Sequence, residues 1–395
     1  MRYDVAVIGC GFVGLTVAAA LNQSGLKVLG VEPRDEIRDK VRAGIAPFRE
    51  PGLVEAMVGL TMCNRLQPED EADAYLICVG TPVVDDGALE RATREVADHM
   101  RDDALVIVRS TVRVGTTRKV VKPILEASGK RFDLAYCPER TVEGNALEEL
   151  RTLPQISAAD DFRTRWRAYE VFEHLGVLCS QAFSFEAGEA AKLLANAWRS
   201  VTFAFSNEVA LLAEEDGFSA REAIAVANFN YPRCQIPAPG PVGGPCLPKD
   251  VKLLTLPQMR GGYSVLHASA VLNSPAVIAT SIARAIDARG VGGSIAVLGT
   301  AFKGLPETDD TRDSPGLRIA ALLATNYANI TTIDPVAPAD QCKFYPDDAF
   351  DVIVVVTNHP FWRETALDER LLVDGFIYDC CGAVAASPRV VRWGG

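Results

Sequence analysis

An apolar run opens the chain and is followed at once by a glycine-rich turn. Val5–Ile8 is continuously apolar, and Gly9–Gly14 comes directly after it. Such a run is typical of a parallel strand that is covered on both faces of its sheet. Leu15–Gln23 has a helical pattern, and a second apolar strand, Val28–Val31, ends at Glu32. This order of strand, turn, helix and strand predicts the start of a doubly wound parallel sheet.

The same alternation continues and then gives way to helices. Further apolar runs, separated by helix-compatible stretches, cover Ala74–Val79, Ala104–Val108 and Phe132–Tyr136. From Glu186 to Asp216 the pattern predicts one long helix, which suits a connector or a dimer spine. The pattern then predicts a helix over Ser219–Asn228, a loop rich in Pro and Gly over 231–248, and another helical run over Val265–Arg289.

The opening pattern returns near the C-terminus as a degenerate repeat. Ile295–Gly304 aligns with Val5–Gly14, Thr332–Pro335 with Gly30–Pro33, and Asp351–Thr357 with Asp73–Gly80. The repeat predicts a second Rossmann-like sheet. The expected fold class is therefore α/β, with two Rossmann-like doubly wound domains joined by a long-helix central domain. The expected boundaries are 1–185 for the first domain, 186–289 for the helical domain and 290–395 for the last.

Composition and charge narrow the class of partner. Of the 395 residues, 48% are hydrophobic and 23% are charged, which excludes a disordered or fibrous chain. The net charge of -11 provides no basic surface for a nucleic-acid backbone. No 18-residue apolar stretch and no signal-peptide pattern occur, so neither a membrane partner nor secretion is expected. The 10 Cys form no CxxC pair and only 4 His occur, which argues against a metal site. Without a secretion signal, reduced thiols and a cytoplasmic location are expected.

The first turn and the acid after the second strand predict a dinucleotide site. Gly9 permits the tight turn, Gly11 lets the backbone approach a pyrophosphate, and Gly14 lets helix and strand pack closely. The carboxylate of Glu32 would bind the ribose hydroxyls and repel a 2′-phosphate, whereas the nearby Arg34 could accommodate one. These features predict NAD as the cofactor. The expected cofactor-binding residues are Gly9, Gly11, Phe12, Val13, Gly14, Glu32 and Arg34.

The second repeat differs from the first at the same turn. Ala301 and Lys303 stand where Gly11 and Val13 stand in the first unit. We therefore expect the second unit not to bind a dinucleotide in the same way. Lys303 instead offers a positive charge to a phosphate or hydroxyl group.

A second concentration of chemistry lies in the stretch Gly243–Asp250. Two Gly and two Pro predict a rigid, irregular loop that carries a thiol, an ammonium and a carboxylate, from Cys246, Lys249 and Asp250. Lys249 could favour the thiolate, and Asp250 could position water or move a proton. A buried structural Cys in a turn is the alternative.

Polar residues on the long helix and after two strands complete the candidates. Lys192 and Asn196 are four residues apart, so they share one helix face and could stabilise an oxyanion, unless they are a solvated surface pair. Thr111 ends a strand, where doubly wound folds place their ligands. Glu139 and Glu143 also follow a strand and could act as acid, base or substrate contacts, or serve only in capping and turns.

These motifs together resemble the UDP-glucose/GDP-mannose dehydrogenase family over essentially the whole chain. In family order they are the Gly9–Gly14 turn, Val79–Pro82, Ser110–Thr111, Cys137–Arg140, Lys192 with Asn196, Gly243–Asp250, Ala301–Lys303 and Thr308–Arg312. The resemblance implies two successive NAD-dependent oxidations that convert the C6 primary alcohol of a nucleotide-linked sugar to a carboxylate. It also implies a place in polysaccharide biosynthesis.

The resemblance assigns roles residue by residue. It implies that Cys246 is the nucleophile and that Lys192 and Asn196 hold the oxygen at C6. Water would be positioned or activated by Thr111, Glu143 and Asp250. The cofactor contacts would include Thr81, Pro82, Thr111 and Arg312, and the substrate contacts Glu139, Arg140, Lys192, Asn196, Arg233, Gly243, Gly244 and Lys303. Arg233 would reach the substrate of a partner subunit in a homodimer formed by the long helices.

The sequence leaves two classes of sugar as the substrate. The stretches from Cys137 and from Pro239 and the insertion Gly304–Glu307 resemble the branch that acts on UDP-N-acetylhexosamines, in particular UDP-N-acetylmannosamine. Val251 and Ser269–Val271 depart from that branch, so UDP-glucose is an alternative.

Two other functions are alternatives to a four-electron dehydrogenase. A two-electron dehydrogenase of the β-hydroxyacid type also pairs a Rossmann domain with Lys-x-x-x-Asn, but it would need neither Cys246 nor a second nucleotide-type domain. A non-catalytic NAD or nucleotide-sugar sensor would not need the thiol, the ammonium and the carboxylate together. A short-chain reductase or epimerase is discounted, because no Tyr is followed by Lys four positions on.

Overall fold

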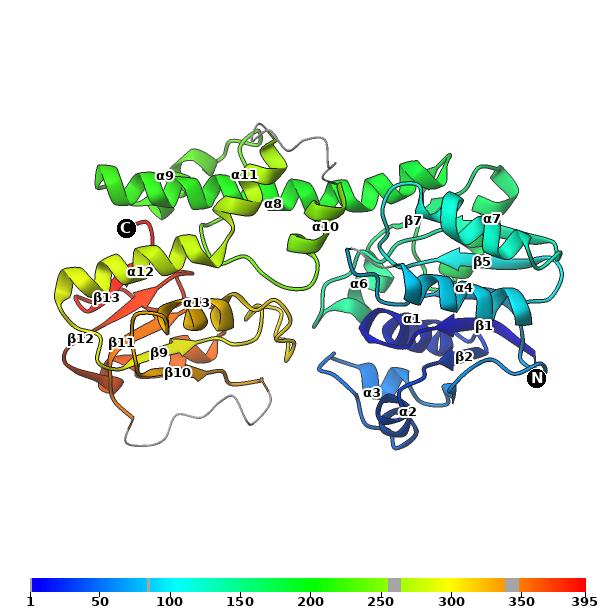
Figure 1. Cartoon of the computed structure of the whole chain (residues 1–395), viewed down its shortest axis with the longest axis horizontal. Coiled ribbons are helices and arrows are strands. Elements are labelled where there is room, and N and C mark those ends of the chain that lie inside the picture. The colour runs from blue at the N-terminus through cyan, green and yellow to red at the C-terminus, as the bar shows by residue number, and fades with distance from the viewer. Residues whose placement is uncertain (1, 84–85, 255–263, 338–347) are drawn as a thin grey trace. The chain divides into compact units, whose positions relative to one another are not determined.

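The computed structural model describes residues 2–83, 86–254, 264–337 and 348–395, and these form two compact units, Met1–Ala195 and Asn196–Gly395. Each unit contains one sheet, and the long helix α8, Phe185–Asp216, passes from the first unit into the second (Figure 1). The expected α/β fold with two Rossmann-like sheets and a helical middle is confirmed. The boundaries of the three expected domains stay a prediction.

The first sheet has the strand order β3-β2-β1-β4-β5-β6-β7-β8. Its strands are β1 Arg2–Ile8, β2 Val28–Val31, β3 Thr61–Cys63, β4 Glu71–Ile77, β5 Ala104–Val108, β6 Phe132–Tyr136, β7 Gln155–Ala158 and β8 Cys179–Ala182. Its helices are α1 Phe12–Gln23, α2 Asp35–Arg42, α3 Leu53–Ala56, α4 Gly87–His99, α5 Lys122–Glu126, α6 Ala146–Thr152 and α7 Phe162–Glu173, and a π-helical turn covers Thr117–Val121.

The chain order of this sheet reverses direction between β1 and β4, so the first turn lies at a topological switch point. All pairings are parallel except that of β6 with β7, which meet antiparallel at Tyr136 and Ala158. The sheet is therefore parallel, as expected, apart from this one pairing. The strands β1, β4 and β5 are buried nearly throughout, which is why they appear in the sequence as unbroken apolar runs.

The second sheet has the order β10-β9-β11-β12-β13. Its strands are β9 Ile295–Leu298, β10 Ile330–Ile333, β11 Phe350–Val355, β12 Leu371–Asp379 and β13 Val390–Arg392. The helices of this unit are α9 Ala220–Asn228, α10 Leu247–Leu254, α11 Val265–Leu272, α12 Pro275–Arg289, α13 Pro315–Leu323 and α14 Phe361–Glu364, with a 3-10 turn at Leu367–Arg370. Its described pairings are parallel.

Alternate residues of β9 and β11 face two separate cores. Ile295 and Val297 pack with Ile282 of α12 and Ile319 of α13, whereas Ala296 lies in the core on the opposite face. In Figure 1, α12 and α13 can be followed over the first of these faces. The sheet is therefore covered on both sides, as a doubly wound sheet requires.

The apolar segment Val265–Arg289 is two helices rather than the single helix expected. The side chain of Ser274 accepts a hydrogen bond from the Ala276 amide, and Pro275 takes the first position of α12. This cap ends α11 at Leu272, because Ser and Pro at these positions begin a helix rather than continue one. The combined segment is long and apolar enough to cross a membrane by length and composition alone. However, Ile278, Ile282 and Ile286 are buried in the core of the second unit.

The internal repeat is real, but its alignment shifts after the glycine of the turn. A Cβ on Gly14 would lie 1.8 Å from the carbonyl oxygen of Gly9, and a Cβ on Gly316 would lie 1.8 Å from that of Gly299. The counterpart of Gly14 is therefore Gly316, and the expected alignment of Gly304 with Gly14 is wrong. The second unit carries an insertion, residues 302–314, between its turn and its helix. We call this segment the 302–314 insertion.

Candidate active site

The first turn has the geometry of an open dinucleotide-binding loop. The Gly9 amide donates to the Val31 carbonyl at 2.8 Å, which holds the turn against β2. A Cβ on Gly11 would approach the guanidinium of Arg34 at 3.5 Å and no other described side chain or backbone within 4 Å. The backbone at Gly11 is thus accessible, and helix α1 begins with Phe12 immediately after it. An open glycine followed by a helix N-terminus is the arrangement that accepts a pyrophosphate.

Glu32 lies beneath this turn and is engaged from two sides. Its carboxylate accepts from the Cys10 amide at 3.0 Å and from the Arg34 guanidinium at 2.7 Å and 3.1 Å. Burial alone would raise the pKa of Glu32, but the hydrogen bonds and charge of Arg34 lower it overall. Glu32 is therefore a carboxylate at neutral pH. Arg34 is largely exposed, so it can leave when a ribose hydroxyl takes its place.

The ends of β4 and β5 are tied together at the same edge of the sheet. The hydroxyl of Thr81 donates to the carbonyl of Thr111, and the hydroxyl of Ser110 donates to the carbonyl of Val79 at 2.7 Å. Pro82 follows Thr81 directly. These bonds bring Thr81, Pro82 and Thr111 together at the carboxyl ends of neighbouring strands, where ligands of doubly wound sheets bind.

Glu139 is buried and its carboxylate is occupied by protein groups. It accepts from the amides of Arg140 at 2.7 Å and Thr141 at 2.9 Å and forms an ion pair with Arg109 at 2.7 Å. Burial would raise the pKa of Glu139, but the charge of Arg109 and these amides lower it overall. Arg109 itself is fully buried and also donates to Gln155 at 3.1 Å. Glu139 thus fixes the loop that it begins, and its contact with substrate stays a prediction.

Two other candidates lie on the same loop. The guanidinium of Arg140 donates to the Pro154 carbonyl at 3.0 Å and is otherwise exposed. Glu143 is half-buried, and the amide of the next residue, Gly144, donates to Glu50 at 2.9 Å. Hydrogen bonds therefore hold the loop on both sides of Glu143, and they fix the backbone that carries this residue.

Lys192 and Asn196 are one turn apart along α8, as expected from their spacing. Lys192 is half-buried and Asn196 is buried. The amide nitrogen of Asn196 donates to Asp250 at 2.6 Å, and both side chains are almost fully buried. The other carboxylate oxygen of Asp250 is buried without a hydrogen-bond partner among the described residues and lies 3.6 Å from the ammonium of Lys249. One oxygen of Asp250 is thus fixed and the other is available to a ligand or water.

Cys246 lies at the start of a helix rather than in the middle of an irregular loop. The Asp250 amide donates to the Cys246 carbonyl at 2.8 Å, and α10 begins at Leu247. The expectation that Lys249 and Asp250 belong to a loop is therefore wrong. Cys246 is exposed, which excludes a packed structural thiol within its own unit. A helix N-terminus stabilises an anion on a side chain at this position.

The glycines before Cys246 permit close packing against the 302–314 insertion. A Cβ on Gly243 would lie 2.6 Å from the Asp313 carbonyl, and one on Gly244 would lie 2.6 Å from the ring of Phe302. The Gly244 amide also donates to the Asp313 carbonyl at 3.1 Å. The insertion therefore supports the turn that presents Cys246.

The remaining candidates lie on this insertion and near α9. The ammonium of Lys303 is 5.4 Å from the centre of the Phe302 ring, and Arg312 pairs with Asp310. Arg233 is exposed and stacks on Tyr231, whose hydroxyl lies 3.1 Å from its Nε. The second unit thus holds Asn196, Cys246, Asp250, Lys303 and the cofactor candidate Arg312. The first unit holds the other cofactor candidates together with Glu139, Glu143 and Lys192.

Sequence reasoning missed several buried charged residues that hold these loops. Glu50, Arg109 and Glu189 are buried and each contacts a loop that carries a candidate residue. Their partners are mostly backbone amides or residues far along the chain, which leave no local pattern. The one available indication for Glu189 was its place on α8, one turn before Lys192. Within the described residues, no group of His, Cys, Asp and Glu side chains is arranged to hold a metal ion.

Three models of one family match consecutive parts of the chain. The UDP-glucose/GDP-mannose dehydrogenase family matches with its NAD binding domain at residues 3–175, its central domain at 186–274 and its UDP binding domain at 296–386. The chain belongs to this family. It is an NAD-dependent nucleotide-sugar dehydrogenase, and the expected cofactor is confirmed.

Named relatives extend over nearly the whole length. UDP-N-acetyl-D-mannosamine dehydrogenase of Pyrococcus horikoshii is 32% identical over 94% of each chain. The solved UDP-D-ManNAc dehydrogenase of the same organism superposes with a TM-score of 0.90 at 30% identity, covering 100% of this chain and 99% of that one. A UDP-glucose dehydrogenase of Pyrobaculum islandicum superposes with a TM-score of 0.84 at 26% identity, covering 100% and 98%.

Proposed function

We propose that this dehydrogenase oxidises the C6 hydroxymethyl of a UDP-N-acetylhexosamine to the uronate in two NAD-dependent steps through a covalent intermediate on Cys246. The observation that carries the proposal is an exposed thiol at the N-terminus of α10, four residues before a buried carboxylate on that helix. One oxygen of this carboxylate accepts no hydrogen bond from the described residues and lies 3.6 Å from the ammonium of Lys249. A two-electron alcohol dehydrogenase has no use for such a thiol. The names of the relatives favour N-acetylmannosamine as the sugar, and UDP-glucose is the alternative.

The first turn, Glu32 and the tied ends of β4 and β5 fit NAD. Gly11 and the N-terminus of α1 would hold the pyrophosphate, and Glu32 would hold the adenosine ribose after Arg34 moves away. NAD when bound supplies the acceptor for a hydride from C6, once for the alcohol and once for the covalent adduct.

Side chains of the enzyme would then transfer protons and stabilise negative charge. The C6 alcohol would lose a hydride to the cofactor and its hydroxyl proton to Lys192, Asp250 or water, which gives an aldehyde. The Cys246 thiolate adds to the aldehyde carbon, and Lys192 and Asn196 stabilise the oxyanion of this adduct. Loss of the second hydride leaves a thioester. Water positioned by Thr111, Glu143 and Asp250 attacks its carbonyl, which releases the carboxylate and returns the thiolate.

Asp250 is suited to move the proton of that water. Asn196 fixes one oxygen of Asp250 at 2.6 Å, so the carboxylate cannot rotate freely. The second oxygen, near Lys249, is left to accept a proton. The NH2 group of Asn196 carries two N–H donors, so one can hold Asp250 while the other donates to the substrate oxyanion.

Counting NADH per sugar tests this function. Purified enzyme should form two NADH per molecule of UDP-N-acetylmannosamine consumed, and Cys246→Ala should bind the sugar but form only a trace of uronate. With Cys246→Ser, an ester should replace the thioester and leave more slowly, so a covalent sugar adduct should accumulate and be visible by mass spectrometry. A Cys246→Ala enzyme that still makes uronate at a near wild-type rate would show that the nucleophile is assigned wrongly.

A panel of UDP-sugars tests the substrate. N-acetylmannosamine, N-acetylglucosamine and glucose should be compared by kcat/KM, with N-acetylmannosamine expected to be highest. One NADH per sugar would favour a two-electron reaction, and none with any sugar would contradict the proposed substrate class.

The proposal includes a homodimer that works in the cytoplasm and supplies uronate for polysaccharide biosynthesis. Trp198, Phe205 and Leu212 are exposed at seven-residue spacing along α8, which is the pattern of an apolar stripe that a partner covers. Arg233 is exposed near this helix's neighbour α9 and would reach the partner's substrate. Mixing inactive Arg233→Ala and Cys246→Ala chains should restore activity in hybrid dimers. An active enzyme that stays monomeric would rule out shared sites.

A further inference from the structure

The first turns of α8 hold a short segment that follows β5. This segment, Gly115–Arg118, follows Thr111 and includes the start of the π-helical turn at Thr117. The carboxylate of Glu189 accepts hydrogen bonds from the amide of Gly115 and, at 2.8 Å, from the amide of Thr117. Each of its two oxygens therefore has a backbone donor in the same segment.

Glu189 is fully buried at this position. Burial raises the pKa of the Glu189 carboxyl, while the hydrogen bonds from Thr117 and Gly115 oppose that rise. A buried carboxylate is costly unless it is hydrogen-bonded, and here the donors are backbone amides of one segment. Removing the carboxylate would therefore leave two buried N–H groups without an acceptor, and the segment would move to satisfy them.

A second contact joins α8 to the same segment, but it is made by partly exposed side chains. Arg118 pairs with Glu186 of α8 at 2.6 Å and with Asp160 at 2.7 Å. These side chains are about one-third or more exposed, so water can replace either partner. Glu186 lies three residues before Glu189 and contacts the same segment, but through the partly exposed side chain of Arg118 instead of the backbone. It provides a matched control.

The segment connects two candidate catalytic residues within the first unit. Thr111 lies four residues before Gly115, and the intervening Val112 is buried in the core. The carbonyl of Thr111 is already fixed by Thr81. Lys192 lies three residues after Glu189, on the next turn of α8 and on the same side. A tie at Glu189 therefore sets the backbone after Thr111 relative to the helix turn that carries Lys192.

We infer that Glu189 is a positioning residue. It holds the loop after Thr111 at a fixed position relative to the turn of α8 that carries Lys192. The inference rests on the proposed function, because that function gives Thr111 and Lys192 their roles. Glu189 does not touch the reacting atoms. It limits the movement of Thr111 relative to Lys192, both of which are proposed to act at C6 of the sugar. Displacing such a group by about 1 Å can lower the rate on the order of a hundredfold.

The experiment compares four variants of the full-length enzyme. Glu189→Gln keeps the shape but presents its NH2 group to one of the two amides, so it satisfies at most one of them. Glu189→Ala removes both acceptors. Glu186→Gln tests the exposed ion pair. Asp161→Ala removes the side-chain cap of α7 and so lowers stability without touching the hydrogen bonds of Glu189.

Steady-state kinetics separate positioning from loss of stability. We expect Glu189→Gln and Glu189→Ala to lower kcat at least about tenfold, with KM for NAD changed less than about threefold. Glu186→Gln and Asp161→Ala should keep kcat within about twofold of wild type, even where the melting temperature falls as far as in Glu189→Gln. Equal kcat values in Glu189→Gln and Asp161→Ala at matched melting temperature would overturn the inference.

Amide hydrogen exchange gives a measurement that does not need a folded variant. In the wild-type enzyme the amides of Gly115 and Thr117 should be protected, and in Glu189→Gln exchange should accelerate in residues 112–121 but not in β5. Rapid exchange of both amides in the wild type would overturn the inference even if the variants fail to fold. The proposed function fails separately, if wild-type enzyme forms no NADH with any UDP-sugar.

Discussion

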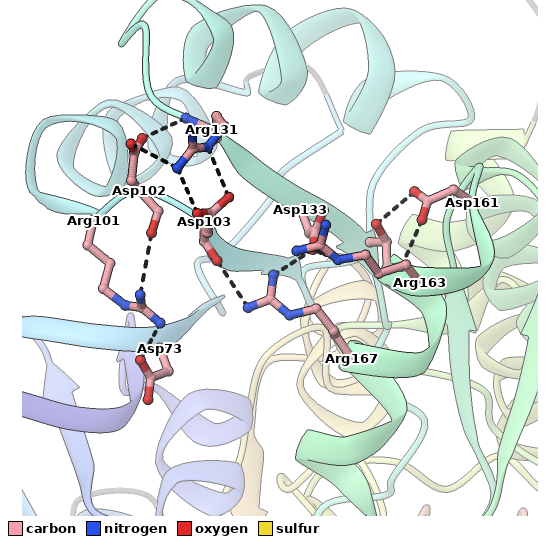
Figure 2. A network of polar contacts seen from close by, with 10 residues as sticks. Asp73, Arg101, Asp102, Asp103, Arg131, Asp133, Asp161, Arg163 and Arg167 are labelled. Atoms are coloured by element: carbon pink, nitrogen blue, oxygen red, sulfur yellow. Dashed lines mark hydrogen bonds and ion pairs between the residues drawn. The ribbon is translucent and has the colours of Figure 1, made fainter.

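The carboxyl and amino edges of the first sheet both carry acidic and basic side chains. These side chains differ in how deeply they are buried and in what they bind. At the carboxyl edge, Glu32, Glu50, Glu139 and Glu189 are buried, and each accepts hydrogen bonds from backbone amides. At the amino edge, charged side chains pair mainly with each other, as Figure 2 shows for Asp73, Arg101, Asp102, Asp103, Arg131, Asp133 and Arg167. The number of charged groups does not distinguish the edges, but their burial and partners do.

This difference shows where a charge determines backbone position. Arg131 at the amino edge is 71% exposed and pairs with Asp103 at 2.9 Å. Water can replace either partner there, so such a pair constrains little. Arg109 at the carboxyl edge is 0% exposed and pairs with Glu139, which also holds two loop amides. Losing one partner there leaves a buried charge, and the loop must rearrange.

The largest effect is expected from breaking the buried pair. Arg109→Met should lower the free energy of unfolding by about 3–5 kcal/mol, because Glu139 is left buried without its cation. Urea unfolding measured at several pH values checks both the size and the cause. In the wild type the pKa of Glu139 is held below its ordinary value. Its contribution to stability is therefore complete above the unfolded-state pKa of about 4.3 and is lost as the pH falls below it.

In Arg109→Met the sign of this pH dependence should reverse. A buried, unpaired Glu139 has a raised pKa, so its protonation would stabilise the folded variant as the pH falls. The double variant Arg109→Met with Glu139→Gln should recover part of the lost stability, since no buried charge is left. A single variant as stable as wild type at pH 7 would contradict the contrast between the edges.

An intermediate effect is expected from Glu32, the carboxylate proposed to bind the adenosine ribose. Glu32→Gln should lower kcat/KM for NAD by about ten- to a hundredfold, which corresponds to the loss of a charged hydrogen bond. The ratio of kcat/KM for NADP to that for NAD should rise, because the 2′-phosphate no longer meets a negative charge. Arg34→Met is the control, since it removes the cation and keeps the carboxylate. Comparable kcat/KM for NAD and NADP in the wild type would contradict the role given to Glu32.

The smallest effect is expected at the amino edge. Arg101→Gln removes the pair with Asp73, whose side chains are about one-third exposed, and should lower the free energy of unfolding by less than about 1 kcal/mol. Added salt should shrink the difference further, because exposed charges are screened. A loss as large as that of Arg109→Met, insensitive to salt, would remove the distinction between the edges.

The parts of the fold that could be predicted from the sequence are those with short-range causes. The turn from Gly9 to Gly14 and the acid at Glu32 lie in one strand–helix–strand unit, so their spacing alone indicates their geometry. The long helix was also apparent, because its pattern continues without Gly or Pro between Gly188 and Gly217. Its observed start, Phe185, differs from the expected start by one residue.

The missed parts depend on contacts distant in the chain or on a cap. The 302–314 insertion hid the true partner of Gly14, because the alignment of the repeat assumed equal turn lengths. The start of α10 was missed, because Pro and Gly around Cys246 favoured a loop over a helix that begins at Leu247. The pair of Arg109 with Glu139 joins residues thirty apart, and no spacing rule brings them together.

The close packing of Gly243 and Gly244 on the 302–314 insertion has a consequence for exchange between relatives. A crossover placed between residues 250 and 295 would separate the turn before Cys246 from the surface it packs on, because Gly243 and Gly244 lie against the Asp313 carbonyl and the Phe302 ring. Gene fragments that recombine successfully should therefore keep 239–250 and 302–314 from the same parent. A chimaera that takes β9 to β13 from another parent should therefore also take the turn with Cys246 from that parent.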